Sequence, residues 1–449
     1  MSTRKRYAIV GVGGRSKMYM KALASSHAEY GELVALCDLN AVRLDFANEQ
    51  LSHEFGYHTV PTYAPVDFET MISRERVDTV IVTSMDRTHH TYIIKALDAG
   101  CDAISEKPMT IDAEKCAAIH AALNRSGKKL TVTFNYRYSP RNSRVKEVLK
   151  SGEIGEVKSV HFEWLLDTSH GADYFRRWHR DKRNSGGLLV HKATHHFDLV
   201  NWWLESTPRE VFAFGDLVFY GKENAEARGV SKFYDRSTGN PIARQDPFAL
   251  HLDKNEKLRR TYLEAESEDG YRRDQSVFSD GISIEDDMSV LVKYNNGAAM
   301  SYHLTAYSPW EGFRIAFNGT KGRLEYNVTE VSYISTSDSD IHGEHSIGRT
   351  GHAADVPAQL ILHRHWQSPE HLTFEKSDES GHGGGDVRLL DDVFKGPGDD
   401  PLARAADHTA GTNSILTGIA ANMSMAQKRP IDVNSLRADV RSGPPMNAG

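Results

Sequence analysis

The segment that most constrains the fold is a glycine-rich turn near the start of this 449-residue chain. An apolar run from Arg6 to Val10 leads into residues 11–16, GVGGRS, after which apolar residues recur at helical spacing. The pattern predicts a strand, a tight turn and a helix. Gly11 permits the turn, Gly13 lets the backbone approach a pyrophosphate, and the N-terminus of the helix faces the anion. The turn therefore predicts dinucleotide binding by Gly11, Gly13, Gly14, Arg15 and Ser16, the last of which replaces the third glycine of the G-x-G-x-x-G fingerprint.

The end of the second predicted strand, Glu32 to Cys37, indicates the type of dinucleotide. Asp38 follows this strand about 25 residues after the glycine turn. A carboxylate there accepts hydrogen bonds from both hydroxyls of an adenosine ribose and repels a 2′-phosphate. We therefore expect NAD as the cofactor. NADP is the less favoured alternative, because Arg43 is close in sequence and a guanidinium can bind the additional phosphate.

Strands and helices continue to alternate through the first third of the chain. Strands are expected at 78–83, 101–104 and 129–134, and helices at 89–97 and 112–123. Such alternation predicts an α/β protein with an N-terminal Rossmann domain, a doubly wound parallel sheet, over residues 1–135. Because the chain exceeds one ordinary domain, residues 136–449 are expected to form a second, substrate-binding domain.

The second region combines strand patterns, two long polar stretches and a final helix. The stretches at about 221–280 and 340–386 lack a strand or helix period, and we interpret them as insertions of the kind that form lids or binding loops. A C-terminal helix is expected at about 410–427. Runs rich in β-branched and aromatic residues predict strands at 157–165, 211–219, 289–294, 298–304 and 313–318.

Composition and charge favour a small-molecule ligand. With 39% hydrophobic and 26% charged residues, the chain is neither collagen-like nor disordered. The net charge of −7, without a basic block, argues against nucleic acid or a membrane as the partner. No apolar run reaches the roughly 18 residues of a membrane helix. The three cysteines have no Cys-x-x-Cys spacing, which is typical of reduced thiols, so we expect a cytoplasmic protein.

Polar residues follow three of the predicted parallel strands. In a doubly wound sheet, ligands bind beyond the carboxyl ends of the strands, so these residues are candidates for chemistry. The three segments are 84–90 (SMDRTHH), 106–108 (EKP) and 135–138 (NYRY). From them we predict further cofactor contacts by Ser84, His89, Glu106, Lys107 and Asn135.

The motif Glu106-Lys107-Pro108, behind a glycine turn, resembles the glucose-fructose oxidoreductase, inositol dehydrogenase and rhizopine-catabolism family, Gfo/Idh/MocA. Segment 186–198, GGLLVHKATHHFD, resembles a second motif of that family, with His195 and Asp198 in their expected places. The resemblance implies a nicotinamide-dependent enzyme. It also implies a C-terminal α+β domain built on an open antiparallel sheet, and a homo-oligomer that associates through this sheet.

Lys107 and His195 are the expected catalytic pair. Hydride transfer from a carbinol needs a base for the hydroxyl proton and a positive charge near the developing alkoxide. We assign His195 as the proton acceptor and Lys107 as the electrostatic partner of the same oxygen. His191 stands where the family commonly has an Asp, so His191 or Lys192 is expected to take the place of that carboxylate.

The pair His191 and His195 also admits a metal-site interpretation, since a helix places residues four apart on one face. No Glu lies between them as in the zinc motif H-E-x-x-H. We therefore predict two imidazoles that line the pocket and no metal ion.

Sugar binding favours aromatic faces and planar donors, and both occur next to the motifs. We predict an NAD-dependent oxidoreductase that acts on a hydroxyl or keto group of a sugar, glycoside or polyol. One alternative is an NAD-dependent glycoside hydrolase or lyase that oxidises the sugar transiently and returns the hydride. Another is a non-catalytic NAD- or sugar-binding protein, which would not require Lys107 and His195 together. The predicted substrate contacts are Tyr136, Arg137, Arg177, Trp178, His179, Lys192 and His196.

Overall fold

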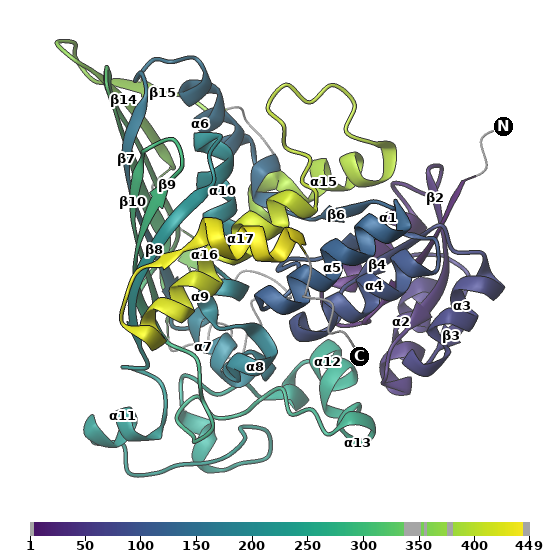
Figure 1. Cartoon of the computed structure of the whole chain (residues 1–449). Helices are drawn as coiled ribbons and strands as arrows, with labels where there is room; N and C mark the ends of the chain where they lie inside the picture. Colours follow the sequence, from purple (N-terminus) through teal and green to yellow (C-terminus); the bar gives the residue numbers. More distant parts are fainter. Residues whose placement is uncertain (1–3, 336–351, 354–356, 375–379, 443–449) are drawn as a thin grey trace, which may run out of the picture.

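A parallel sheet organises the N-terminal domain of the computed structural model (Figure 1). The structure describes residues 4–335, 352–353, 357–374 and 380–442. Within these residues the sheet has six strands in the order β3-β2-β1-β4-β5-β6, and every pair is parallel, which confirms the predicted doubly wound sheet. The strands are β1 (Lys5–Val10), β2 (Gly31–Cys37), β3 (Thr62–Tyr63), β4 (Thr79–Val82), β5 (Asp102–Ser105) and β6 (Leu130–Val132).

Helices connect these strands, and two of them, α2 and α5, begin at a side-chain cap. The side chain of Asn40 accepts from the backbone N–H of Arg43 at the start of α2, and Asp112 caps α5 in the same way. Gly127 ends α5 with a φ of +65°. The elements are α1 (Ser16–Ala24), α2 (Ala41–His53), η1 (Pro65–Asp67), α3 (Phe68–Glu75), η2 (Asp86–Thr88), α4 (His89–Asp98), α5 (Ala113–Ser126) and η3 (Asn135–Tyr138).

A mixed sheet forms the framework of the C-terminal domain. Its ten strands in the described residues include the path β15-β14-β12-β11-β7-β10-β9-β8-β16, with β13 beside β12. All neighbours are antiparallel except β7 and β10, which are parallel and far apart in sequence, so a crossover can join them. The strands are β7 (Val157–Asp167), β8 (Pro208–Asp216), β9 (Asp287–Tyr294), β10 (Ala299–Ser308), β11 (Glu311–Gly319), β12 (Gly322–Tyr333), β13 (His352–Ala353), β14 (Gln359–Arg364), β15 (Glu370–Leu372) and β16 (Ile431–Asp432).

The two faces of this second sheet differ. Along β9, Val290 and Val292 are buried on the inner face, which α10 and α16 cover on the side of the first domain (Figure 1). Phe214 and Leu291 are 68% and 58% exposed on the outer face, where the expected homo-oligomer contact stays a prediction. The helices of this domain outside its long polar stretch are α6 (Pro140–Lys150), α7 (His170–Arg176), η4 (Trp178–Arg180), α8 (Lys182–Ser185), α9 (Leu188–His191), α10 (Thr194–Leu204), α15 (Ser380–Lys395), α16 (His408–Gln427) and α17 (Val433–Ser442).

The two polar stretches differ from the expected insertions. The interpretation of 340–386 is wrong for its described residues, because β14 and β15 form a sheet edge there and α15 begins at Ser380. These edge strands are short and rich in polar residues, so they lack a clear period. Residues 340–351, 354–356 and 375–379 lie outside the described residues. Stretch 221–280 holds only short helical segments, α11 (Lys222–Ala227), η5 (Ile242–Gln245), η6 (Leu252–Lys254), α12 (Glu256–Leu258), η7 (Arg259–Leu263) and α13 (Glu266–Asp269).

The length and polarity of each helix decide whether it could cross a membrane. Across the described ranges, none of the helices combines the length and the apolar character needed to span a lipid bilayer.

Asp167, at the end of β7, has a raised pKa. Its buried carboxylate accepts hydrogen bonds from the backbone N–H groups of Ser169 and His170, both at 2.8 Å. Burial, followed by the negative charge of Glu311, raises the pKa of Asp167 to about 7. An unfolded Asp titrates near pH 4. The folded state therefore binds this proton more tightly, and the stabilisation it gives is lost as the pH rises from about 4 to about 7.

We expect Asp167→Asn to remove this pH dependence, since Asn keeps the acceptor oxygen and cannot ionise. Between about pH 5 and pH 8, the free energy of unfolding of the unmodified protein should fall by up to about 3 kcal/mol more than that of the variant. Urea unfolding at both pH values measures the difference. Asp399→Asn, at an exposed carboxylate, is the control and should follow the unmodified protein. Equal pH dependence in Asp167→Asn and the unmodified protein would contradict this assignment.

Candidate active site

Gly11 and Gly13 give the turn after β1 the shape that a dinucleotide requires. Gly11 has a φ of +89°, and a Cβ there would lie 2.5 Å from the Cα of Ser84. Only glycine fits this position. A Cβ on Gly13 would meet no described atom within 4 Å, so the surface above it is open. The hydroxyl of Ser16 donates to the carbonyl of Gly13 at 2.7 Å. These residues fit a pyrophosphate at the N-terminus of α1.

Asp38 and Arg43 lie where the adenosine ribose is expected. The buried carboxylate of Asp38 accepts hydrogen bonds from the backbone N–H groups of Val12 at 2.8 Å and Asn40 at 2.9 Å. Arg43 forms an ion pair with Asp269 of α13 at 2.6 Å. Stretch 221–280 therefore engages part of the guanidinium, while its Nη2 is buried without a hydrogen-bond partner among the described residues.

A charged network holds Arg15 beside the turn. Arg15 and the hydroxyl of Tyr19 both donate to the same oxygen of Glu106, at 2.7 Å. Asp386 of α15 lies 3.3 Å from Arg15 and accepts from the side chain of Asn135 at 2.6 Å. Burial alone would raise the pKa of Glu106, but the guanidinium of Arg15 lowers it overall. Arg15, Glu106 and Asn135 are thus joined in one network next to the expected cofactor.

The prediction that His89 binds the cofactor is wrong. Its Nδ1 lies 2.8 Å from the carbonyl oxygen of Pro108, and its Nε2 lies 2.9 Å from the carbonyl oxygen of Ser84. Burial lowers the pKa of His89, so the neutral ring donates a hydrogen bond to one of these carbonyl oxygens at a time, and both nitrogens face backbone carbonyls. His89 therefore ties the loop after β4 to the loop after β5 and has no free nitrogen for a ligand.

Stretch 221–280 borders the dinucleotide turn, a contact that the sequence does not reveal. The side chain of Asn40 donates to the carbonyl of Ala265 at 2.8 Å, and Arg260 forms an ion pair with α2 at 2.6 Å. The hydroxyl of Tyr262 lies 3.7 Å from the position of a Cβ on Gly14. Residues of the C-terminal domain therefore line one side of the expected cofactor site.

Lys107 lies just beyond the carboxyl end of β5. Burial of most of its side chain lowers its pKa to about 8, although the carboxylate of Asp86 opposes this effect. Its Nζ lies 3.4 Å from the carbonyl oxygen of His191 and donates to it. An amine in this position can bind an oxyanion or exchange a proton.

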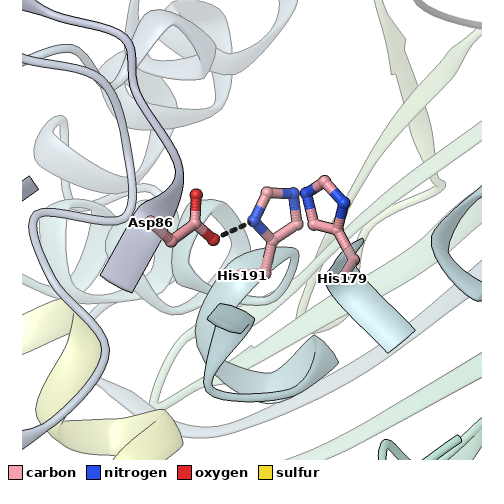
Figure 2. Close-up of side chains that lie close together, drawn as sticks. All are labelled: Asp86, His179 and His191. Carbon is pink, nitrogen blue, oxygen red and sulfur yellow. Dashed lines mark hydrogen bonds and ion pairs between the residues drawn. The ribbon is translucent and has the colours of Figure 1, made fainter. Parts of the chain in front are cut away.

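His191 has a carboxylate partner from the other domain. Its Nδ1 lies 2.5 Å from Oδ2 of Asp86 in η2, and both side chains are buried (Figure 2). The expectation that His191 and His195 share one helix face is wrong, because α9 ends at His191 and α10 begins at Thr194. His191, which stands at the position of the motif's Asp, therefore contacts a carboxylate of the first domain.

His195 stacks on Tyr136 in the first turn of α10. The two ring centroids are 4.3 Å apart, with an interplanar angle of 16°. The amine of Lys192 lies 3.5 Å from the hydroxyl of Tyr136 and 5.1 Å from the ring centroid of Trp164. Burial lowers the pKa of Lys192. The charge of Lys192 also lowers the pKa of Lys107, so the two amines belong to one region.

Two residues predicted to contact the substrate belong to the core instead. Arg137 and Asp198 form a buried ion pair with two hydrogen bonds, at 2.6 and 2.7 Å. His196 is fully buried, its Nδ1 lies 2.6 Å from the hydroxyl of Tyr302, and its ring stacks on Trp164. Both predictions are wrong, because these side chains are used in packing between α10 and its neighbours.

Arg177, Trp178 and His179 lie in one group near Asp173. Arg177 forms an ion pair with Asp173 at 2.9 Å, and Arg273 forms another at 2.6 Å. Burial would raise the pKa of Asp173, but these guanidinium groups lower it overall. Trp178 stacks on His179 with ring centroids 3.5 Å apart. The group offers aromatic surface and planar donors, as the sequence predicts.

Asp86 and Arg273 are site residues that the sequence patterns did not predict. Asp86 stands in the polar segment directly beyond β4, so its place at a strand end was a usable signal. Arg273 is fully buried but comes from stretch 221–280, where no pattern separates it from the other polar residues. Only the tertiary fold brings Arg273 to Asp173.

A dinucleotide turn in a parallel sheet, with an amine beyond the end of one of its strands, is typical of oxidoreductases that use a nicotinamide cofactor. Residues 5–134 match the family model described as an oxidoreductase family, NAD-binding Rossmann fold. Residues 146–433 match the model of the oxidoreductase family, C-terminal alpha/beta domain. The chain belongs to the Gfo/Idh/MocA oxidoreductase family.

Relatives with known names agree with this assignment. The chain is 36% identical to YteT of Bacillus subtilis (strain 168), a protein named as an oxidoreductase, over 96% of this chain and 98% of that protein. It is 28% identical to inositol 2-dehydrogenase of Rhizobium meliloti (strain 1021), over 46% of this chain and 57% of that protein.

Two solved structures share the fold. The aldose-aldose oxidoreductase from Caulobacter crescentus has a TM-score of 0.61 at 15% identity, covering 96% of this chain and 100% of that one. The WlbA dehydrogenase from Bordetella pertussis, solved with NADH and UDP-GlcNAcA, has a TM-score of 0.60 at 18% identity, covering 96% of this chain and 99% of that one. At these identities the likeness concerns the fold.

Proposed function

We propose that the protein is an NAD-dependent oxidoreductase that acts on a CH–OH or keto group of a sugar, glycoside or polyol. The proposal rests on Lys107, which lies beyond β5 and directly follows Glu106, a partner of Arg15 in the dinucleotide turn. It also rests on His195, whose stacking partner Tyr136 lies 3.5 Å from Lys192, an amine that acts on the pKa of Lys107. Aromatic and planar groups such as Trp178 and Arg177 support a carbohydrate substrate. The names of the inositol and aldose relatives support the same class.

Each residue has a defined part in the proposed reaction. When bound, NAD supplies an acceptor for the hydride of the carbinol carbon. His195 takes the proton of the substrate hydroxyl, and the amine of Lys107 stabilises the negative charge that develops on the oxygen. Asp86 holds His191, and the carbonyl of His191 accepts a hydrogen bond from Lys107 and orients the amine. Stacking on Tyr136 holds the ring of His195.

Lys107→Ala and His195→Ala are each expected to lower kcat by about a hundredfold or more, because each removes a group that acts on the reacting oxygen. The Kd for NAD should change little, since neither side chain lies at the adenosine end. Steady-state kinetics on a panel of sugars, glycosides and polyols, with calorimetry for NAD, measures both quantities.

The double variant tests whether the two groups share one oxygen. If they do, its loss should be smaller than the product of the two single losses. A loss equal to that product would contradict the shared role. His161→Ala, at an exposed position of β7, is the control and should keep full activity. Binding of NAD and sugar without any turnover in the unmodified protein would favour the non-catalytic alternative.

The proposal includes a preference for NAD over NADP. Asp38 repels a 2′-phosphate, and Asp269 engages the nearby cation of Arg43. We expect Asp269→Ala to release Arg43 and to lower the Kd for NADP by about tenfold, with little change for NAD. Asp38→Ala should weaken NAD binding and reduce discrimination.

Arg260→Ala is the matched control for Asp269→Ala. It removes another contact between stretch 221–280 and α2 but leaves the pair of Arg43 and Asp269 in place. NADP affinity should therefore not improve in this variant. Tighter binding of NADP than of NAD by the unmodified protein, measured by calorimetry, would contradict the preference.

A glycoside hydrolase or lyase with internal cofactor recycling is the second candidate, and stretch 221–280 favours it. Asp269 and Arg260 attach this stretch to α2, and Tyr262 lies beside Gly14. A cofactor bordered in this way is expected to exchange slowly. Slow exchange suits a reaction that oxidises one carbon, eliminates the aglycone through the acidified neighbouring C–H, adds water and returns the hydride.

On this second candidate, we expect NAD to stay bound at one molecule per chain through gel filtration and to support glycoside cleavage without added cofactor. Tyr262→Ala should release NAD several-fold faster, because it opens the side of the turn. Mass spectrometry of the purified protein and assay of the released aglycone measure both effects. Release of one NADH for each oxidised sugar would contradict internal recycling of the cofactor. The first proposal, a dehydrogenase that releases NADH, would then stand.

A further inference from the structure

Three buried side chains from separate segments converge at the boundary between the two domains (Figure 2). Asp86 belongs to η2 of the first domain, His179 to η4, and His191 to the end of α9. One nitrogen or oxygen atom from each lies within 4.8 Å of the others. Figure 2 shows the ring of His191 between the other two, with one nitrogen toward Asp86 and the other toward His179.

Not every polar atom of these three side chains has a hydrogen-bond partner. Asp86 and His191 are in contact at 2.5 Å, but the rings of His179 and His191 meet at an angle of 72°, with centroids 4.1 Å apart. His179 is only 3% exposed, and its Nδ1 has no hydrogen-bond partner in the described part of the chain. Buried imidazole nitrogens without a hydrogen-bond partner are uncommon in folded proteins, so we examine whether these three side chains bind a ligand.

Two imidazoles and one carboxylate form a ligand set for a divalent transition metal. Catalytic zinc sites use three protein ligands of this kind and leave a fourth position for water or substrate. In a tetrahedral site, metal–ligand bonds of about 2.0–2.2 Å place neighbouring ligand atoms about 3.3–3.6 Å apart. Separations of up to 4.8 Å in this cluster must therefore close by about 1 Å when the ion binds, and the Asp86–His191 contact of 2.5 Å must open by a similar amount.

The surrounding charges determine which metal the cluster favours. Lys107 and Arg177 act on Asp86 and oppose a cation. Asp173 pairs with Arg177 at 2.9 Å but also with Arg273 at 2.6 Å, so Arg177 and Lys107 both remain as opposing charges. Nitrogen ligands and a nearby ammonium favour a metal with strong bonds to imidazole, such as Zn²⁺, over Mg²⁺ or Ca²⁺.

We propose that Asp86, His179 and His191 bind one divalent transition-metal ion, with Zn²⁺ as the reference ion. This site replaces the sequence-based expectation of no metal. Three protein ligands leave a coordination position, and Lys107 contacts the carbonyl of His191, one of the three residues. The ion acts there as a Lewis acid that polarises a hydroxyl or carbonyl oxygen of the substrate and does not change its oxidation state.

Titration of the metal-free full-length protein with Co²⁺ and Zn²⁺, in the absence of NAD and sugar, tests the site. We expect one Co²⁺ per chain, with the visible absorption of four- or five-coordinate cobalt, and its displacement by Zn²⁺. His179→Gln should weaken binding by at least about tenfold, because it removes a ligand. Zn²⁺ should raise the Tm of the unmodified protein and not that of His179→Gln.

His58→Ala, at an exposed histidine outside the cluster, is the matched control and should bind like the unmodified protein. Asp86→Asn provides a second test if circular dichroism shows that His179→Gln is unfolded. Two results would overturn the proposal: no saturable binding at one equivalent, or equal affinity in the unmodified protein and the folded cluster variants. Because NAD and sugar are absent from the titration, its failure leaves the proposed oxidoreductase function intact, and loss of that function leaves the metal site intact.

Discussion

The buried contact between Asp86 and His191 is the interaction on which the rest of the site depends. It joins the loop after β4 in the first domain to the end of α9 in the second, at 2.5 Å. The carbonyl of His191 accepts a hydrogen bond from Lys107, so the same residue orients the amine proposed for the chemistry. Loss of this contact, with no bound ion to replace it, would leave a buried polar group unpaired.

Stretch 221–280 connects the two ends of the expected cofactor and substrate region. Asp269 pairs with Arg43 near the adenosine end, and Arg273, only a few residues later, pairs with the buried Asp173 beside Arg177. A movement of this stretch therefore changes both ends together. This physical link gives a reason why cofactor retention and substrate binding are expected to be coupled.

The first sheet, its glycine turn and the position of Asp38 could be predicted from short stretches of the sequence. A strand, a turn and a helix each have a characteristic pattern of residues within a short stretch of sequence. At Gly11 the structure supplies the physical reason, because the backbone of Ser84 approaches too closely for a side chain. The parallel pairing of β7 and β10 and the edge strands β14 and β15 depend on distant partners, so they were not predictable. The same reason applies to side-chain roles, because Asp86 and Asp198 meet their partners only after the chain has folded.

Isotope transfer is the most direct test of the central claim that this site moves a hydride between a carbohydrate carbon and NAD. A panel of sugars, glycosides and polyols, each deuterated at its carbinol carbons, is incubated with the protein and NAD, and the cofactor and the sugars are analysed by mass spectrometry. We expect deuterium from at least one substrate to appear on the nicotinamide, and Lys107→Ala or His195→Ala to reduce this transfer strongly. Bound NAD that never acquires deuterium, while every substrate is recovered unchanged, would contradict the claim.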